Sequence, residues 1–159
     1  MDDRQIARDV LDAQERTGPI ALLGSVEAGQ LLAGARRIAI VGASPNPDRP
    51  SHGVMRYLLE QGYDCVPINP HADRVLGQLA YPTLEAAVAA GGPFDVVDVF
   101  RRSEATVGVA RSAVAIGAGA LWLQLSVVNW EAARIASSAG LPVVMDRCTA
   151  IEHRRLRFR

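Results

Sequence analysis

Residues 37–53 of this chain read Arg-Ile-Ala-Ile-Val-Gly-Ala-Ser-Pro-Asn-Pro-Asp-Arg-Pro-Ser-His-Gly. An apolar run ends at Gly42, a polar loop containing prolines follows, and a helix can begin at Ser51. This order of strand, loop and helix points backbone N–H groups at one spot, where a phosphate group can bind. The next glycine after Gly42 is Gly53, so the spacing matches neither the dinucleotide motif G-x-G-x-x-G nor a P-loop. The stretch therefore predicts a nucleotide-like ligand, but neither NAD nor ATP in particular.

Four further apolar segments follow, and each gap between neighbouring segments is long enough for a helix. Ser51, Thr83, Ser103 and Asn129 can cap these helices, and glycines can end them. Regular alternation of strands and helices is typical of a parallel sheet covered on both faces. The sequence thus predicts an α/β fold, a Rossmann-like doubly wound parallel five-stranded sheet with strands at 37–42, 64–68, 95–100, 120–125 and 142–146 and helices at 51–61, 83–90, 103–116 and 129–139.

The segments that flank the sheet suggest the domain organisation. Two predicted helices, 3–15 and 25–34, precede the first strand and are joined by Thr17-Gly18-Pro19. The segment that follows the last strand, 149–159, is basic and can begin as a helix. We expect a helical N-terminal extension at 1–34, a Rossmann-like domain at 35–153 and a basic tail at 154–159.

The composition limits the partners and the chemistry. The chain has 159 residues, 49% of them hydrophobic, which is enough for one domain with its own core. Seventeen basic residues balance seventeen acidic ones, so we expect neither nucleic acid nor a membrane surface as a partner. Every basic residue is arginine, which excludes a Schiff-base lysine and leaves arginine and backbone amides to bind an anion.

The cysteines and the chain start point to the cytoplasm. Cys65 and Cys148 are far apart and form no C-x-x-C pair, so we expect neither a disulfide nor a zinc site. The first residues, Met-Asp-Asp-Arg-Gln, are charged where a signal peptide would be apolar. No apolar run approaches the ~20 residues of a membrane span.

Residues that follow the predicted strands are candidates for a binding site, because parallel sheets bind ligands beyond the carboxyl ends of their strands. All five ends are polar or contain glycine, and arginines occur at three of them, which fits an elongated anionic ligand. Of Arg101 and Arg102, we expect one to face the ligand and the other the solvent. The five ends are 42–53, 69–71, 100–102, 124–126 and 146–148.

The end of the second strand argues against NAD. An NAD site needs Asp or Glu there to bind the ribose 2′-hydroxyl, whereas this chain has Asn69, Pro70 and His71. Neutral or cationic groups suit a ribose that carries a phosphate. NADP and coenzyme A (CoA) are therefore both open as ligands.

Several motifs in the same order resemble the small, single-domain bacterial CoA-binding proteins, which are similar to the N-terminal CoA-binding domain of the succinyl-CoA synthetase α subunit. The resemblance covers about residues 35–153. The motifs are Val-Gly-Ala-Ser (41–44) with Pro-Asp-Arg-Pro-Ser (47–51), Val-Pro-Ile-Asn-Pro (66–70), Val-Asp-Val-Phe-Arg-Arg-Ser-Glu (97–104), Trp-Leu-Gln-Leu (122–125) and Val-Met-Asp-Arg-Cys (144–148).

The resemblance implies a strand order of 3-2-1-4-5 and a CoA molecule lying across the carboxyl edge of the sheet. One departure is Ser126, where family members usually have glycine. The implied cofactor-binding residues are Gly42, Ala43, Ser44, Arg49, Ser51, His52 and Gly53 at the phosphates, Asn69, Pro70 and His71 at the adenosine, and Phe100, Arg101, Gln124 and Leu125 along the remainder.

No set of catalytic or metal-binding residues is evident in the sequence. Asp95 and Asp98 are three positions apart on one strand and so point to opposite faces, which favours structural roles. Cys148 is expected to be a buried, unreactive thiol rather than a partner for the CoA thiol. His52, His71 and His153 have no evident carboxylate partner.

The resulting hypothesis is a domain that binds CoA or an acyl-CoA without chemistry of its own. A protein partner, such as an acyl-CoA synthetase-like chain, and a second copy of this chain are both compatible with it. The alternatives are an NADP-dependent oxidoreductase module, which would need a separate substrate domain, and an assembly protein with a vestigial crevice. We expect Gly42→Val to abolish CoA binding and leave the fold intact.

Overall fold

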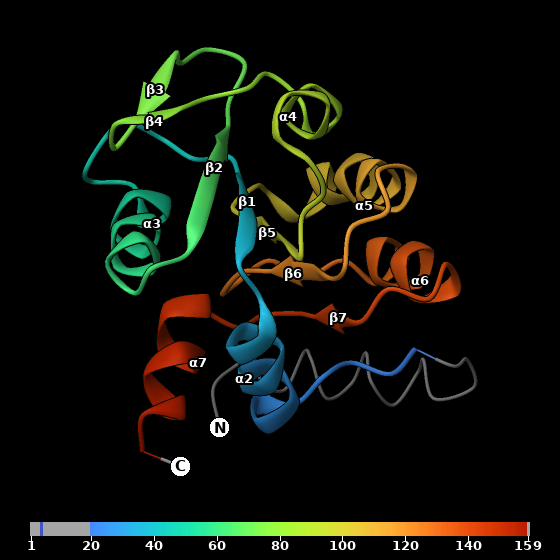
Figure 1. The fold of residues 1–159 in the computed structure, drawn as a ribbon. Coiled ribbons are helices and arrows are strands. Elements are labelled where there is room, and N and C mark those ends of the chain that lie inside the picture. Colours follow the sequence, from blue (N-terminus) through green and yellow to red (C-terminus); the bar gives the residue numbers. More distant parts are fainter. Residues whose placement is uncertain (1–3, 5–19, 159) are drawn as a thin grey trace.

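The computed structural model describes residue 4 and residues 20–158. Its centre is a sheet of five parallel strands, which confirms the predicted Rossmann-like architecture (Figure 1). In spatial order, the strands are β2 (Asp64–Ile68), β1 (Arg37–Val41), β5 (Val96–Val99), β6 (Leu121–Leu123) and β7 (Val143–Val144).

The strand order differs from the one that the resemblance implies. Counted as predicted, the order is 2-1-3-4-5 and not 3-2-1-4-5, because β1 pairs with β2 on one side and with β5 on the other. The chain winds from β1 outward to β2 and then crosses back over β1. Right-handed crossovers in opposite directions leave from opposite faces, so the switch point lies between β1 and β5.

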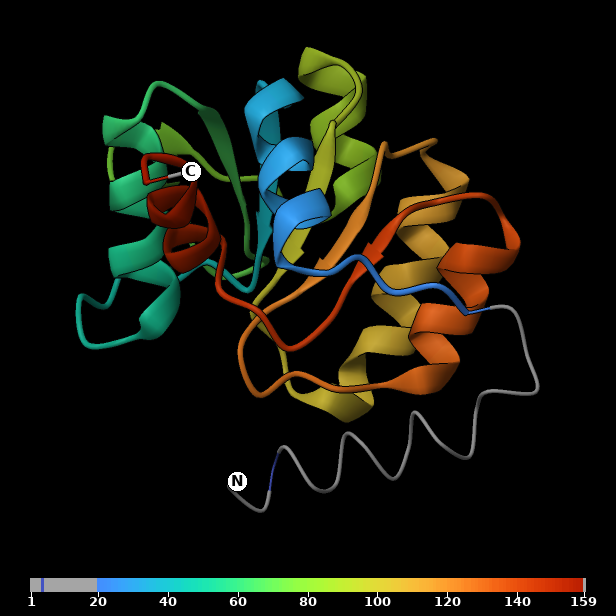
Figure 2. The same cartoon turned by 90° about the horizontal axis from the view of Figure 1, so that it is seen from below.

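Helices cover both faces of the sheet (Figures 1 and 2). One face packs against α4 (Leu84–Gly91), α5 (Thr106–Ala115) and α6 (Trp130–Ser138), and the other packs against α2 (Ser25–Gly34), α3 (Pro50–Glu60) and α7 (Thr149–Leu156). A short 3-10 helix, η1 (Ser103–Ala105), precedes α5. Among the described residues, none of the helices is long and apolar enough to span a membrane.

The predicted helix caps are right at two of four positions. The side chains of Thr83 and Asn129 accept hydrogen bonds from the first turns of α4 and α6, as expected. Helix α3 begins one residue before Ser51, because Pro50 fits the first helical position. The hydroxyl of Ser51 instead accepts a hydrogen bond from the Ser44 N–H, and Ser103 Oγ accepts one from the Val128 N–H.

The predictions for the two ends of the chain are confirmed in part. Helix α2 matches the prediction for 25–34 and contributes the fully buried Ala28 and Leu32 to the core. Helix α7 accounts for the predicted helical start of 149–159. The predicted helix 3–15 and its junction at Thr17-Gly18-Pro19 lie outside the described residues, apart from Arg4. The proposed domain boundaries stay a prediction.

A small antiparallel hairpin lies between β2 and α4 and was not predicted. It consists of β3 (Arg74–Val75) and β4 (Gln78–Leu79), joined by Leu76 and Gly77. Both joining residues have positive φ angles, 49° and 76°, as a type I′ hairpin turn requires. Leucine is uncommon in such a turn, so no local pattern indicated the hairpin.

The turn after β1 has no room for a side chain. Gly42 has φ 84°, and a Cβ atom built there would lie 2.3 Å from the carbonyl oxygen of Phe100. The added Cβ would collide with a backbone atom, which cannot move aside as the end of a flexible side chain can. The expectation that Gly42→Val leaves the fold intact is therefore wrong.

We predict opposite effects of alanine at the two glycines of the first loop and helix. Gly53 is exposed in α3 with open space around it, so Gly53→Ala should raise the free energy of unfolding by about 1 kcal/mol. Gly42→Ala should lower it by ~2 kcal/mol or more, because a left-handed residue would also overlap the Phe100 carbonyl. Urea denaturation measures both, and similar effects at the two positions would contradict this account.

Candidate functional site

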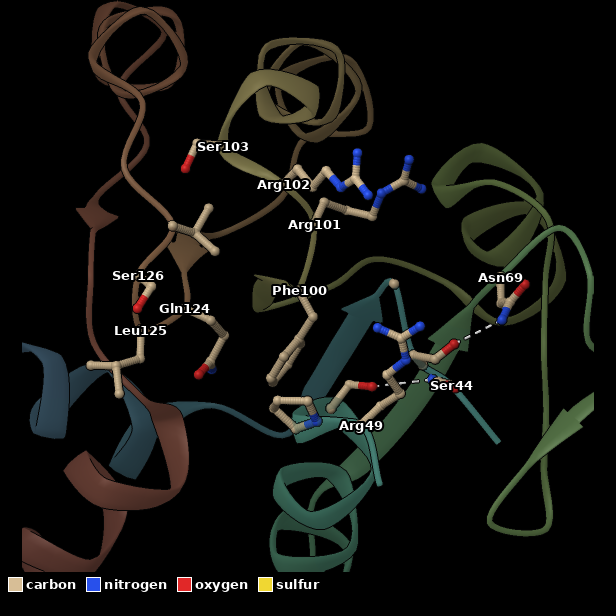
Figure 3. Close-up of a pocket in the computed structure, with 15 residues that line it drawn as sticks. Ser44, Arg49, Asn69, Phe100, Arg101, Arg102, Ser103, Gln124, Leu125 and Ser126 are labelled. Carbon is tan, nitrogen blue, oxygen red and sulfur yellow. Dashed lines mark hydrogen bonds between the residues drawn. The ribbon is translucent and has the colours of Figure 1, made fainter. Parts of the chain in front are cut away.

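A pocket of about 520 Å³ lies at the carboxyl ends of β1, β5 and β6, beside the switch point of the sheet (Figure 3). The loops that build it come from strands far apart in sequence, and their ends meet because the strands are parallel. Its walls are Gly42, Ala43, Ser44, Arg49, Pro50, Ser51, Asn69, Phe100, Arg101, Arg102, Ser103, Gln124, Leu125, Ser126 and Val127.

The loop after β1 is held in shape by its own polar side chains. Ser44 Oγ accepts a hydrogen bond from the Asn46 N–H at 3.1 Å, and Asn46 Oδ1 accepts one from the Asp48 N–H at 3.0 Å. Asn69, at the end of β2, donates from Nδ2 to the Ala43 carbonyl at 2.8 Å. These bonds fix one end of the pocket before any ligand arrives.

This pocket is strongly basic although the chain as a whole is neutral. Arg49, Arg101 and Arg102 line it, and none of its lining residues is acidic. In the described part of the chain, no carboxylate forms an ion pair with these three guanidinium groups. The prediction that only one of Arg101 and Arg102 faces the pocket is wrong, since both line it. Figure 3 draws their side chains extending in the same direction.

Most of the predicted site residues gather at this pocket. Pro70 lies outside it and lines an adjoining pocket of about 320 Å³ between α4 and α5, to which Arg101 also contributes. His52, Gly53 and His71 line neither pocket. The residues brought together are Gly42, Ala43, Ser44, Arg49, Ser51, Asn69, Phe100, Arg101, Gln124 and Leu125, and their role in binding stays a prediction.

The two histidines that lie outside the pockets have other contacts. His52 is buried on α3, and its Nδ1 lies 3.2 Å from Nη2 of Arg56, one turn along the helix. His71 is exposed, and its N–H donates to Asn69 Oδ1 at 2.7 Å. Side-chain direction depends on where each helix and turn begins, which the motif spacing did not specify.

The predicted site left out five lining residues, Pro50, Arg102, Ser103, Ser126 and Val127. For Ser126, the sequence did contain an indication. Ser126 has φ 72°, a left-handed conformation that glycine adopts without strain, which agrees with the glycine that the resemblance implies at this position. Its N–H donates to Asp146 Oδ1 at 2.7 Å, and Arg4 also binds that carboxylate.

A buried polar triangle lies behind the pocket wall. Gln124, which lines the pocket, donates from Nε2 to Asp98 Oδ1 at 2.6 Å and to Thr149 Oγ1 at 2.9 Å. The Thr149 hydroxyl donates to Asp98 Oδ2 at 3.0 Å. Asp98 and Thr149 have no exposed surface. Asp95 instead accepts from the backbone N–H groups of Arg36 and Arg37, so the two carboxylates form no pair.

Burial changes the acidity of three groups near the sheet. It raises the pKa of Asp98 to about 7, although hydrogen bonds from Gln124 and Thr149 favour the charged form. It also raises the pKa of Cys65 to about 12 and that of Cys148 above its ordinary value. Both cysteines are free and are thiols, not thiolates, at neutral pH, but Cys148 is half-buried and not buried as expected. The described residues contain no group of His, Cys, Asp and Glu side chains that could bind a metal ion.

The raised pKa of Asp98 predicts a pH-dependent stability. Between pH values near 4 and 7, Asp98 is ionised in the unfolded chain but protonated in the folded one, so its contribution to stability is lost as pH rises through about 7. Asp98→Asn removes this titration. The variant should gain free energy of unfolding relative to wild type from about pH 4 to pH 7, by at most about 1.4 kcal/mol per pH unit, and the difference should stay constant above pH 7. Urea denaturation at several pH values tests this, and a pH-independent difference would rule it out.

Known proteins resemble this chain over most of its length. YneT of Bacillus subtilis (strain 168), itself uncharacterized, is 39% identical over 127 residues, which cover 80% of this chain and 92% of YneT. A hypothetical protein from Pyrococcus horikoshii OT3 superposes with a TM-score of 0.79 at 38% identity, covering 85% of this chain and 93% of that one.

A larger protein contains a related domain. The apo form of the dinucleotide-forming acetyl-coenzyme A synthetase 1 of Ca. Korarchaeum cryptofilum matches with a TM-score of 0.61 at 26% identity, over 69% of this chain and 26% of the synthetase. A family model described as a CoA binding domain matches residues 36–154. These matches confirm the resemblance seen in the motifs, and the chain belongs to this family of CoA binding domains.

Proposed function

We propose that this protein binds CoA or an acyl-CoA in the 520 Å³ pocket and catalyses no reaction there by itself. The observation that carries the proposal is the uneven pocket wall, with arginines and fixed loop amides on one side and the apolar Phe100 and Leu125 beyond them (Figure 3). CoA has the same division, because its phosphates are at one end and its uncharged pantetheine arm is at the other. The family match supports the same ligand.

The proposed ligand lies across the ends of the strands. Its phosphates bind the Gly42–Ser44 loop together with Arg49, Arg101 and Arg102, whose guanidinium groups suit phosphate oxygens. Its adenosine lies near Asn69 and reaches the adjoining pocket lined by Pro70. The pantetheine arm runs past Phe100 toward Gln124 and Leu125, which lie on the far side of the pocket in Figure 3.

The proposed absence of chemistry is supported by the residues at the pocket wall. The lining contains no Cys, His, Lys, Asp or Glu, so no residue of the pocket wall itself offers its serines a general base. Such a domain can sense, carry or deliver the cofactor, or supply its site to a partner chain or a second copy of itself. The two free cysteines support a reducing compartment, which we take to be the cytoplasm.

Isothermal titration with CoA and with NADPH tests the proposed ligand. We expect CoA to bind at least about tenfold more tightly, because Asn69 and the basic loops meet a phosphorylated adenosine while the far wall suits a slender arm. Tighter binding of NADPH would favour the oxidoreductase alternative. Binding of neither compound would favour an assembly protein with a vestigial crevice.

The arginine nearest the first loop gives a second prediction. Arg49→Gln should weaken CoA binding by about tenfold or more, because a charge-assisted hydrogen bond to phosphate is lost. Arg111→Gln is the matched control, since it removes the same charge from an exposed position on α5 outside the pocket. Equal affinities of the two variants would show that Arg49 does not contact the phosphates.

A further inference from the structure

The buried triangle behind the pocket has a defined arrangement of protons. The Gln124 amide has two N–H hydrogens on Nε2, and both are used, one toward Asp98 Oδ1 and one toward Thr149 Oγ1. The single hydroxyl hydrogen of Thr149 is directed at Asp98 Oδ2. Each donor in the triangle therefore has an acceptor inside the protein.

One polar atom of the triangle is left without a partner. Gln124 Oε1 accepts no hydrogen bond from the described residues, although the Gln124 residue is only 3% exposed. Because Gln124 lines the pocket and its Nε2 is held from behind, the pocket wall offers an acceptor and no donor at this position. An acceptor at the pocket wall that no protein group satisfies is available to a ligand that supplies a donor.

We infer that Asp98 is a positioning residue that orients the Gln124 amide, so that Gln124 Oε1 accepts a hydrogen bond from an amide N–H of the pantetheine arm. This inference rests on the proposed function, since it names the part of CoA that Gln124 selects. Asp98 lies behind Gln124 and acts only through it. The pocket then distinguishes CoA from ligands that share its phosphorylated adenosine but lack the amide-bearing arm.

The orientation depends on which acceptor Asp98 provides. Leucine has a similar size but no acceptor, so in Asp98→Leu the Thr149 hydroxyl loses its partner and Gln124 Oε1 becomes its nearest replacement. The amide then turns, and Nε2 faces the pocket. Asparagine keeps an Oδ1 acceptor for Nε2, and its Nδ2 replaces Oδ2 as a partner of Thr149 by donating to Oγ1, so the native orientation is preserved.

The experiment compares two ligands by isothermal titration at about pH 8, above the pKa of Asp98. CoA has the pantetheine arm, and adenosine 3′,5′-bisphosphate lacks it. Asp98→Leu should weaken CoA binding by about tenfold and change binding of the bisphosphate by less than about twofold. Asp98→Asn should keep CoA affinity within about threefold of wild type.

A double-variant cycle separates positioning from a general effect on the fold. Gln124→Met removes the acceptor and should cause the same selective loss of CoA affinity. Asp98→Leu should then have no further effect in the Gln124→Met background, because Asp98 acts through Gln124. Should Asp98→Leu fail to fold, Gln124→Met alone decides, and unchanged CoA affinity in it overturns the inference.

Two further outcomes distinguish failure of the positioning role from failure of the proposed function. Loss of affinity for both ligands to the same extent in Asp98→Leu, or for neither, overturns the positioning role while leaving CoA binding intact as the function. A wild-type protein that binds neither ligand overturns the proposed function itself.

Discussion

Just beyond the paired ends of β1 and β5, the backbones of Gly42 and Phe100 approach so closely that no Cβ fits between them, while the Phe100 N–H donates to the Val41 carbonyl. From this contact the first loop turns toward α3 on one face, and the next turns toward η1 and α5 on the other. The two loops diverge because their crossovers cover opposite faces of the sheet. The pocket is the space between them.

The pocket differs in charge from the chain as a whole. The chain has no net charge, yet three arginines from two loops line one pocket that has no acidic residue. Two serines and two asparagines secure the first loop, so its amides are ordered without a ligand. A site built in advance binds an anion without the entropic cost of ordering its loops.

Behind this basic surface, the structure tolerates a carboxylate with no exposed surface in the middle of the sheet. Such a group is costly unless it is hydrogen-bonded, and Asp98 has neutral donors but no cation against it. Gln124 belongs both to this triangle and to the pocket wall. The hydrogen bonds that offset the burial of Asp98 therefore also hold a side chain of the site. The same triangle joins β5, β6 and the start of α7, so it also connects the site to the C-terminal helix.

The sequence by itself determined the alternation of strands and helices, the caps at Thr83 and Asn129, and ten of the residues that line the pocket, because these follow from local periodicity, side-chain capping and motif order. Only the tertiary structure decided the strand order, the position of His52 and His71 outside the pocket, and the partnership of Asp98 with Gln124 and Thr149. These depend on which strands pair and where each turn points, and such contacts join residues far apart in the chain, where no local pattern specifies them.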